Sequence, residues 1–195
     1  MASGPSRRAF VIASFVFGGW WLLFRRPARA LPDPSAEGNG PFVTLLLYSN
    51  DGRKRALQAL RKIVKTDAEW RAELFPEVYA VTRQAHTEFA FANKLWDEYR
   101  PGLYRCICCA TALFWSREKF DSGTGWPSFT APVAAQNIAT REDHALTEAR
   151  TEVLCSRCDA HLGHVFNDGP MPAGLRYCLN SAALAFDSPG TEPRP

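Results

Sequence analysis

The chain has 195 residues, enough for one ordinary domain with short extensions, and its 46% hydrophobic and 22% charged residues are typical of a globular protein. Its formal net charge is +3, but the first 30 residues carry five arginines and no acid. Without that segment, 18 basic residues face 20 acidic ones, a net charge of about −2. The body of the protein is therefore not basic, which excludes the electrostatic footprint of a nucleic-acid-binding protein.

Residues 1–30 have the composition of an export signal. Arg7 and Arg8 precede an uncharged stretch at residues 9–24, and a small-residue A-x-A pattern ends the segment. The paired arginines resemble a twin-arginine signal, which predicts an exported protein, either periplasmic or anchored in the membrane and facing the periplasm. The alternative to cleavage is a retained anchor through residues 9–24, although 16 residues span only about 24 Å as a helix and a bilayer core is about 30 Å thick.

The following segments read as turns and short apolar runs. Residues 31–41 hold three prolines and two glycines and are predicted to be a linker. Residues 42–48 are apolar and partly β-branched, and the Asn-Asp-Gly sequence at residues 50–52 is a strong hairpin-turn signal. Residues 53–64 are compatible with either a returning strand or a short helix.

Two short helices are predicted next. Thr66 and Glu69 form the capping box that begins the first helix, and Pro76 opens the second. After Trp96, glycines and prolines break the chain into short segments. Among these, strands are predicted at residues 113–115, 165–166 and 182–186. Residues 188–195 contain no large apolar side chain and are predicted to be a disordered tail.

Four of the six cysteines form two pairs with a spacing of three residues, Cys106 with Cys109 and Cys155 with Cys158. A CxxC turn directs both thiols at one centre, so two such turns predict a closed Cys₄ site for one structural zinc ion. The alternatives are two local disulfides or a redox-active CxxC pair. Neither pair follows the strand-to-helix pattern of thioredoxin-like redox motifs. Cys108 is left over, and it is interpreted first as a bystander thiol.

Three segments suggest a reactive site: residues 120–129, 161–170 and 176–181. Cys178 stands alone between an arginine and an asparagine, and it is a candidate nucleophile. In a strand, alternation places Arg176, Cys178 and Asn180 on one face. The simpler interpretation, a small buried hydrophobic cysteine, fits poorly with these polar neighbours. Structural histidines at 161 and 164 and a core Trp126 are the corresponding simple alternatives for the other segments.

The same segments carry a resemblance to a known family. The order of YRCICC, KFDSGTGWPSF, CSRCDAHLGHVFNDGP and RYCLNSAAL resembles the type B methionine sulfoxide reductases, over residues 64–186. The resemblance implies a mainly β fold of two small twisted antiparallel sheets with short N-terminal helices and a Cys₄ zinc site. Residues 42–187 are then the catalytic domain, and the implied reaction is reduction of the R diastereomer of methionine sulfoxide, mainly in proteins.

The resemblance also implies roles for individual residues. Cys178 matches the nucleophile, and Trp126 matches the residue that receives the sulfoxide methyl group. The matching zinc ligands are Cys106, Cys109, Cys155 and Cys158. The matching polar wall of the site consists of His161, His164, Asp168, Arg176 and Asn180.

These residue types suit the chemistry. A thiolate attacks the sulfoxide sulfur, and Arg176 is expected to lower the pKa of the Cys178 thiol. An imidazole can protonate the leaving oxygen near neutral pH, so His161 or His164 is the predicted acid, without a choice between them. Asn180 is a candidate to hold the oxygen or orient a water. The product is methionine with a sulfenic acid on Cys178.

The chain departs from the family where many relatives carry a resolving cysteine, because Thr124 occupies that position. A thioredoxin-like protein or a small thiol is therefore the expected reductant, and Cys108 is the alternative resolving residue. The expected substrate partners are oxidised proteins or peptides, and the protein is expected to act as a monomer. Two rival functions are a zinc-stapled interaction domain without activity and a zinc hydrolase, although His161 and His164 do not form an HExxH pattern.

Overall fold

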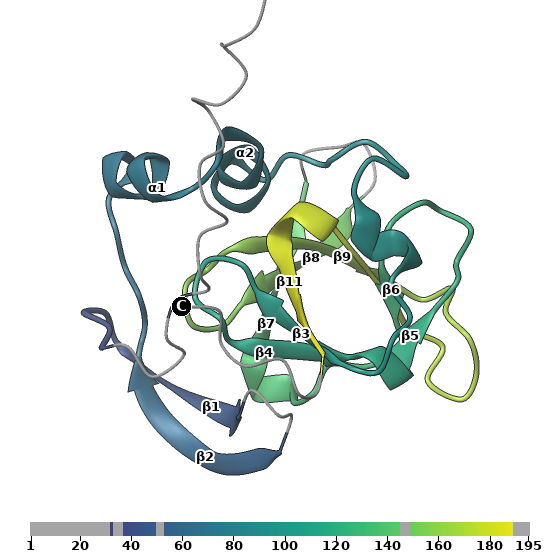
Figure 1. The fold of residues 1–195 in the computed structure, drawn as a ribbon, viewed down its shortest axis with the longest axis horizontal. Helices are drawn as coiled ribbons and strands as arrows, with labels where there is room; N and C mark the ends of the chain where they lie inside the picture. Colours follow the sequence, from purple (N-terminus) through teal and green to yellow (C-terminus); the bar gives the residue numbers. More distant parts are fainter. Residues whose placement is uncertain (1–31, 33–36, 50–52, 145–148, 189–195) are drawn as a thin grey trace, which may run out of the picture.

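The computed structural model describes residues 32, 37–49, 53–144 and 149–188 (Figure 1). The predicted export signal, the anchor at residues 9–24, the turn at residues 50–52 and nearly all of the predicted tail lie outside these residues. Within them, no helix has the length and apolar character needed to cross a membrane.

The first described element is a β-hairpin. Strand β1 (Phe42–Tyr48) pairs antiparallel with β2 (Lys54–Arg61), with Phe42 opposite Arg61. The segment whose sequence fits either a strand or a short helix is therefore a strand, because pairing with β1 satisfies its backbone groups. Leu45 is fully buried, whereas most of β2 is exposed.

Both predicted helices are present. Helix α1 (Asp67–Glu73) begins with the capping box, since the Thr66 side chain accepts from the Glu69 backbone and the Glu69 carboxylate accepts from Thr66. Helix α2 (Pro76–Gln84) starts with proline at its first position and ends at Ala85, which has a left-handed φ of 55°. Figure 1 shows the two helices side by side at one end of the sheets.

Two further antiparallel sheets form the body of the domain. The larger contains, in spatial order, β5 (Lys119–Phe120), β6 (Ser128–Phe129), β10 (Arg176–Leu179), β9 (His161–Phe166), β8 (Arg150–Cys155) and β7 (Ile138–Asp143). The smaller contains β11 (Leu184–Asp187), β3 (Leu103–Cys106) and β4 (Ala112–Trp115). The short 3₁₀ helices are η1 (Lys94–Asp97), η2 (Ser116–Glu118), η3 (Ala135–Asn137) and η4 (Ser181–Ala183). The predicted mainly β class is confirmed, with the hairpin as an added third sheet.

The core lies between the two larger sheets and the helices. Tyr104, Phe114 and Phe129 are fully buried. The centre of the Phe129 ring lies 4.9 Å from that of Tyr104 and 4.7 Å from that of Phe114. Trp70 and Tyr79 anchor the two helices to the same cluster. The predicted strand at 182–186 needs correction at its start, because η4 occupies its first residues and β11 begins only at Leu184.

Candidate active site

A cavity of about 160 Å³ opens beside β10. Its lining comes from the segment after α2, the loop before β6, and strands β8, β9 and β10. The lining residues are Thr87, Trp126, Arg150, Gly163, His164, Phe166, Cys178, Leu179 and Asn180. Sites for drug-sized molecules usually measure about 300–1,000 Å³. This cavity therefore suits a single side chain better than a large cofactor.

Cys178 is one of the residues that line the cavity. On β10 it lies opposite His164 of β9 on one side and Ser128 of β6 on the other. Directly opposed residues of antiparallel strands point to the same face, so the thiol and the imidazole share a face of the sheet. Cys178 is half-buried and free, whereas the other five cysteines are buried.

The ionisation of Cys178 differs from the expectation. Burial raises the pKa of its thiol above the ordinary value, and the charge of Arg176 and hydrogen bonds from Thr124 and Ser128 lower it by less. Arg176 therefore acts in the expected direction, but its effect is smaller than that of burial, and the net pKa of the thiol is raised. Arg176 is itself engaged, because its guanidinium donates to both carboxylate oxygens of Asp168 at 2.8 and 2.7 Å.

Arg176 and Asp168 form a pair at the edge of the site. The Arg176 guanidinium lies 4.4 Å from the centre of the Phe166 ring, and Phe166 lines the cavity. The pKa of Asp168 is lowered, first by its hydrogen bond from Arg176. Asp168 is exposed and is not among the lining residues, so its contact with the site runs through Arg176.

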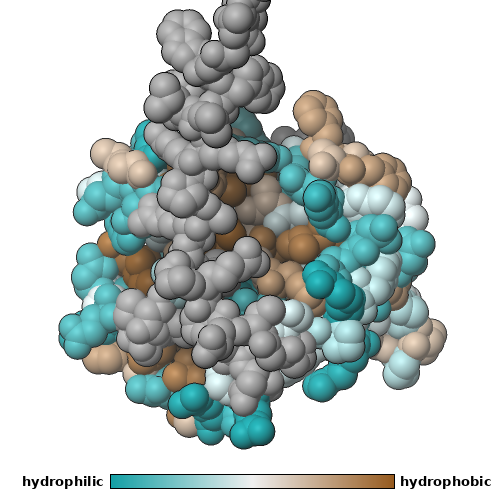
Figure 2. Space-filling view, in the orientation of Figure 1, coloured by the Kyte–Doolittle hydropathy of each residue, from teal (hydrophilic) through white to brown (hydrophobic). Residues whose placement is uncertain are grey.

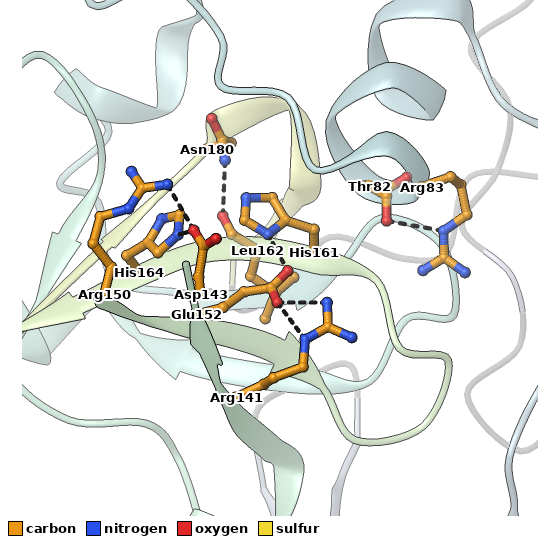
Figure 3. A network of polar contacts seen from close by, with 10 residues as sticks. All are labelled: Thr82, Arg83, Arg141, Asp143, Arg150, Glu152, His161, Leu162, His164 and Asn180. Atoms are coloured by element: carbon orange, nitrogen blue, oxygen red, sulfur yellow. Dashed lines mark hydrogen bonds and ion pairs between the residues drawn. The ribbon is translucent and has the colours of Figure 1, made fainter. Parts of the chain in front are cut away.

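The two histidines, which the sequence leaves equivalent, have different positions. His164 lines the cavity, and its Nε2 donates to Asp143 Oδ2 at 2.8 Å, since a carboxylate can only accept (Figure 3). Asp143 also accepts from Arg150 at 2.6 Å. Arg150 and Asp143 thus form a charged support for His164 that the sequence analysis did not identify, because β7 and β8 meet only in the fold.

His161 lies behind this layer. It is buried, is absent from the cavity lining, and its Nδ1 donates to Glu152 Oε1 at 2.7 Å. Glu152 also pairs with Arg141, as Figure 3 shows, and the distance from Arg141 Nη2 to Glu152 Oε2 is 2.6 Å. Burial lowers the pKa of His161, against the opposing effect of Glu152, so the neutral imidazole is favoured. Its buried Nε2 has no hydrogen-bond partner among the described residues.

Asn180 contacts the cavity, but its amide is already engaged. Its Nδ2 donates to the Leu162 carbonyl at 3.1 Å, and its Oδ1 accepts from the Glu88 backbone at 3.0 Å. Strand β10 ends at Leu179, and Asn180 is the first residue before η4. The amide therefore ties β9, β10 and the segment after α2 together, and the contacts among the described residues use one N–H of Nδ2.

Trp126 also lines the cavity, and Glu88 holds its side chain in place. The indole Nε1 donates to the Glu88 carbonyl at 3.2 Å. The buried Glu88 carboxylate accepts from the backbone of Ser181 at 2.5 Å and of Ala182 at 2.8 Å, which explains why the chain turns into η4 there. The sequence predicts no role for Glu88, because its contacts with Trp126 and η4 join parts of the chain that meet only in the fold.

Thr124 stands next to the thiol. Its Oγ1 lies 4.0 Å from Cys178 Sγ, so the residue at the usual resolving position is close to the nucleophile but carries no sulfur.

The four paired cysteines converge as predicted. Cys106, Cys109, Cys155 and Cys158 are buried, and their sulfurs all lie within 4.8 Å of one another. The Cys106–Cys158 and Cys109–Cys155 sulfur distances are 3.6 and 3.5 Å. Zinc–sulfur bonds of about 2.3 Å would place the sulfurs of a tetrahedron about 3.8 Å apart. The cluster therefore fits a metal ion, and all four thiols are free rather than paired as disulfides.

Cys108 lies against this cluster. It is buried, and its thiol contacts Cys106, Cys158 and Thr82. Cys106 and Cys158 belong to the four-cysteine cluster, and Thr82 lies in α2. No described contact joins Cys108 to Cys178, and its assignment as a bystander stays a prediction.

The sequence of the domain that carries this thiol and the four-cysteine cluster matches a known family. The SelR domain model covers residues 74–188, more than half of the chain. A peptide methionine sulfoxide reductase MsrB from Herminiimonas arsenicoxydans is 57% identical over 127 residues, covering 65% of this chain and 93% of that protein. One from Thiobacillus denitrificans is 57% identical over 122 residues, covering 63% and 92%. The chain belongs to the SelR-domain family, that of the MsrB peptide methionine sulfoxide reductases.

Proposed function

We propose that this protein reduces the R diastereomer of methionine sulfoxide to methionine, mainly within proteins, with Cys178 as the nucleophile. The observation that carries the proposal is the Cys178 thiol opposite His164, in a cavity that accepts one side chain. The names of the similar proteins supply the substrate class.

The chemistry balances with the groups in the cavity. Cys178 Sγ gives up its proton and attacks the sulfoxide sulfur, which forms a sulfur–sulfur bond, and the sulfur–oxygen bond breaks as the oxygen takes up two protons and leaves as water. Water then attacks Sγ and loses one proton, and the sulfur–sulfur bond breaks with its electron pair kept by the methionine sulfur. The substrate sulfur gains two electrons and Sγ loses two, so one thiol and one sulfoxide yield one sulfenic acid and one methionine. Because its pKa is raised, the resting thiol keeps its proton at neutral pH. This proton and one from a general acid leave with the oxygen, and the acid is reprotonated when water forms the sulfenic acid.

His164 is the proposed acid for the leaving oxygen. It lies directly opposite Cys178, and its hydrogen bond to Asp143 fixes the orientation of the ring. His161 is assigned a supporting role, since it is buried behind His164 with a ring-centroid distance of 5.4 Å. The apolar face of Trp126 would receive the methyl group, and its fixed position would select one configuration at sulfur.

An external thiol would regenerate Cys178. One thiol attacks the sulfenic acid and releases water to form a mixed disulfide, and a second thiol then reduces that disulfide. Thr124 cannot supply the first thiol from within the chain. A thioredoxin-like protein or a small thiol is therefore the proposed donor.

The four-cysteine cluster is proposed to hold one structural zinc ion. Its thiols come from the turn after β3 and the turn after β8, so the ion would join the two larger sheets. When bound, zinc supplies cross-linking of these turns and takes no part in the redox reaction.

Export to the periplasm is a separate proposal that rests on the paired arginines and apolar stretch of the first 30 residues. A soluble periplasmic monomer and a form anchored through residues 9–24 are both compatible with it.

The decisive experiment is single-turnover reduction of the two diastereomers of a methionine sulfoxide peptide, by wild type and by Cys178→Ser. We expect one methionine per reduced wild-type chain from the R form, and none from the variant. Thr44→Ser, at an exposed position on β1 away from the cavity, is the matched control. Absence of reduction by zinc-loaded, reduced wild type would replace this proposal with the zinc-stapled interaction domain.

A further inference from the structure

We propose that Phe89 and Phe91 form a docking surface for the polypeptide that flanks the methionine sulfoxide, here called the phenylalanine rim. This inference rests on the proposed function and concerns the part of the substrate that lies outside the cavity.

The rim belongs to a segment that borders the cavity. Thr87 lines the cavity, and the next residue accepts a hydrogen bond from the Trp126 indole. Further along, the Phe91 backbone N–H donates to the Gly125 carbonyl at 2.9 Å. Residues 87–91 therefore run beside Gly125 and Trp126, so the rim is continuous with the wall proposed to hold the sulfoxide methyl group.

Both rim side chains face solvent. Phe89 is 88% exposed and Phe91 is 56% exposed. Burying a phenylalanine removes a large apolar area from water, so two exposed rings beside a cavity favour binding of another apolar surface. Figure 2 shows hydrophobic side chains gathered at the upper right of the molecule, over the region of the segment that follows α2 in Figure 1.

The backbone holds Phe91 in place. Its φ is +62°, a left-handed conformation that is costly for a bulky residue and is usually retained for a reason. Its ring lies against Gly125, where an added Cβ would approach ring atoms to 2.7 Å. The ring also meets Trp96 edge-on, with centroids 5.1 Å apart. Phe91 is thus a fixed platform, and binding on it would cost little conformational entropy.

The size of the cavity indicates what binds to the phenylalanine rim. A volume of about 160 Å³ takes one side chain, so the main chain and neighbouring residues of a protein substrate must lie at its mouth. Methionine is usually a core residue, and its neighbours in an unfolded or damaged segment are often apolar as well. We therefore assign the rim to an extended, apolar segment of an oxidised polypeptide.

The test compares three substrates of R configuration: N-acetyl methionine sulfoxide, a pentapeptide with valines on both sides of the sulfoxide, and one with serines. The variants are Phe89→Ala and, separately, Phe91→Ala. Phe42→Ala is the matched control, because Phe42 is 63% exposed but lies on β1, which contributes nothing to the cavity.

For Phe89→Ala we expect KM for the valine peptide to rise about tenfold with kcat unchanged, and little change for the other substrates. Equal kinetics of wild type and both rim variants with the valine peptide would overturn the rim. Equal losses on all three substrates would also overturn it, since they indicate a distorted cavity. Wild type that reduces the N-acetyl substrate but neither peptide would refute the rim and the preference for protein substrates, and would leave the reduction reaction itself intact. Failure on every substrate would refute the proposed function.

Discussion

The reactivity of Cys178 depends on two opposing influences at the residue scale. Burial disfavours the thiolate, while Arg176 favours it through its charge and hydrogen bond. The guanidinium is shared with Asp168, which keeps it fixed at the edge of the cavity. A resting thiol that is mostly protonated at neutral pH is protected from oxidation until a substrate arrives, because the thiolate is the form that reacts with oxidants.

Arg176→Gln is predicted to raise the pKa of Cys178 further. The wild-type thiol already has a pKa above the ordinary 9.0, and removing the lowering charge moves it upward again. Below that pKa, the thiolate fraction at a given pH falls about tenfold for each unit of increase. The measurement is the pH dependence of iodoacetamide alkylation at Cys178, read by peptide mass. Arg117→Gln, at an exposed arginine, should leave the midpoint unchanged, and an unchanged midpoint in Arg176→Gln would contradict the assignment.

At the scale of elements, the closeness of β9 and β10 brings His164 to Cys178. Gly163 has a φ of +153° and pairs with Leu179, and a Cβ at Gly163 would lie 2.1 Å from the Cys178 carbonyl oxygen. No side chain can occupy that space without moving the backbone. The glycine next to the histidine in the HLGH segment is therefore required for the register that aligns the two reactive groups.

Gly163→Ala is predicted to displace β10 and abolish single-turnover reduction, with a loss of stability of at least about 2 kcal/mol from strain and overpacking. Gly123→Ala is the matched control, because Gly123 also has a positive φ, +68°, but an added Cβ would meet no atom within 4 Å. We expect the free energy of unfolding of the Gly123→Ala variant to fall by only about 1 kcal/mol, and the variant to retain the reaction. Thermal unfolding and methionine release measure the two effects. Full activity in Gly163→Ala would contradict the requirement for glycine at this position.

At the scale of the whole molecule, the four-cysteine cluster connects sequence regions that are far apart. Cys106 and Cys109 flank the turn between β3 and β4, and Cys155 and Cys158 flank the turn between β8 and β9. The cluster is part of the buried core rather than a surface attachment. Without a bound metal ion, the core at this position would contain four unpaired thiols that face one another.

Metal removal is predicted to destabilise the entire domain. Structural zinc contributes about 10–16 kcal/mol in small metal-dependent folds, and a typical domain is stable by only about 5–15 kcal/mol. We expect about one zinc per chain by metal analysis, and unfolding at least about 10 °C lower after chelation under reducing conditions. Re-addition of zinc should restore both the melting temperature and the reaction. A metal-free protein with the same melting temperature would rule out the structural role.

The sequence by itself determined the features that depend on short spacings. The Thr66–Glu69 capping box predicted α1, the two CxxC pairs predicted the cysteine cluster, and the four motifs led to the family and the mainly β class. Such features are readable because residues three or four apart have nearly fixed relative geometry in a helix or turn. The catalytic roles of the site residues stay predictions that the experiments above address.

Only the tertiary structure decided which histidine faces the thiol, why residues 53–64 include a strand, and how Glu88 and Asp143 support the site. It also showed that burial raises the pKa of the Cys178 thiol by more than Arg176 lowers it. These properties depend on partners from distant strands and on the exclusion of water, and neither is encoded in the local spacing of residues. Desolvation in particular is a property of the assembled fold, and here it outweighs the nearby positive charge that the sequence makes visible.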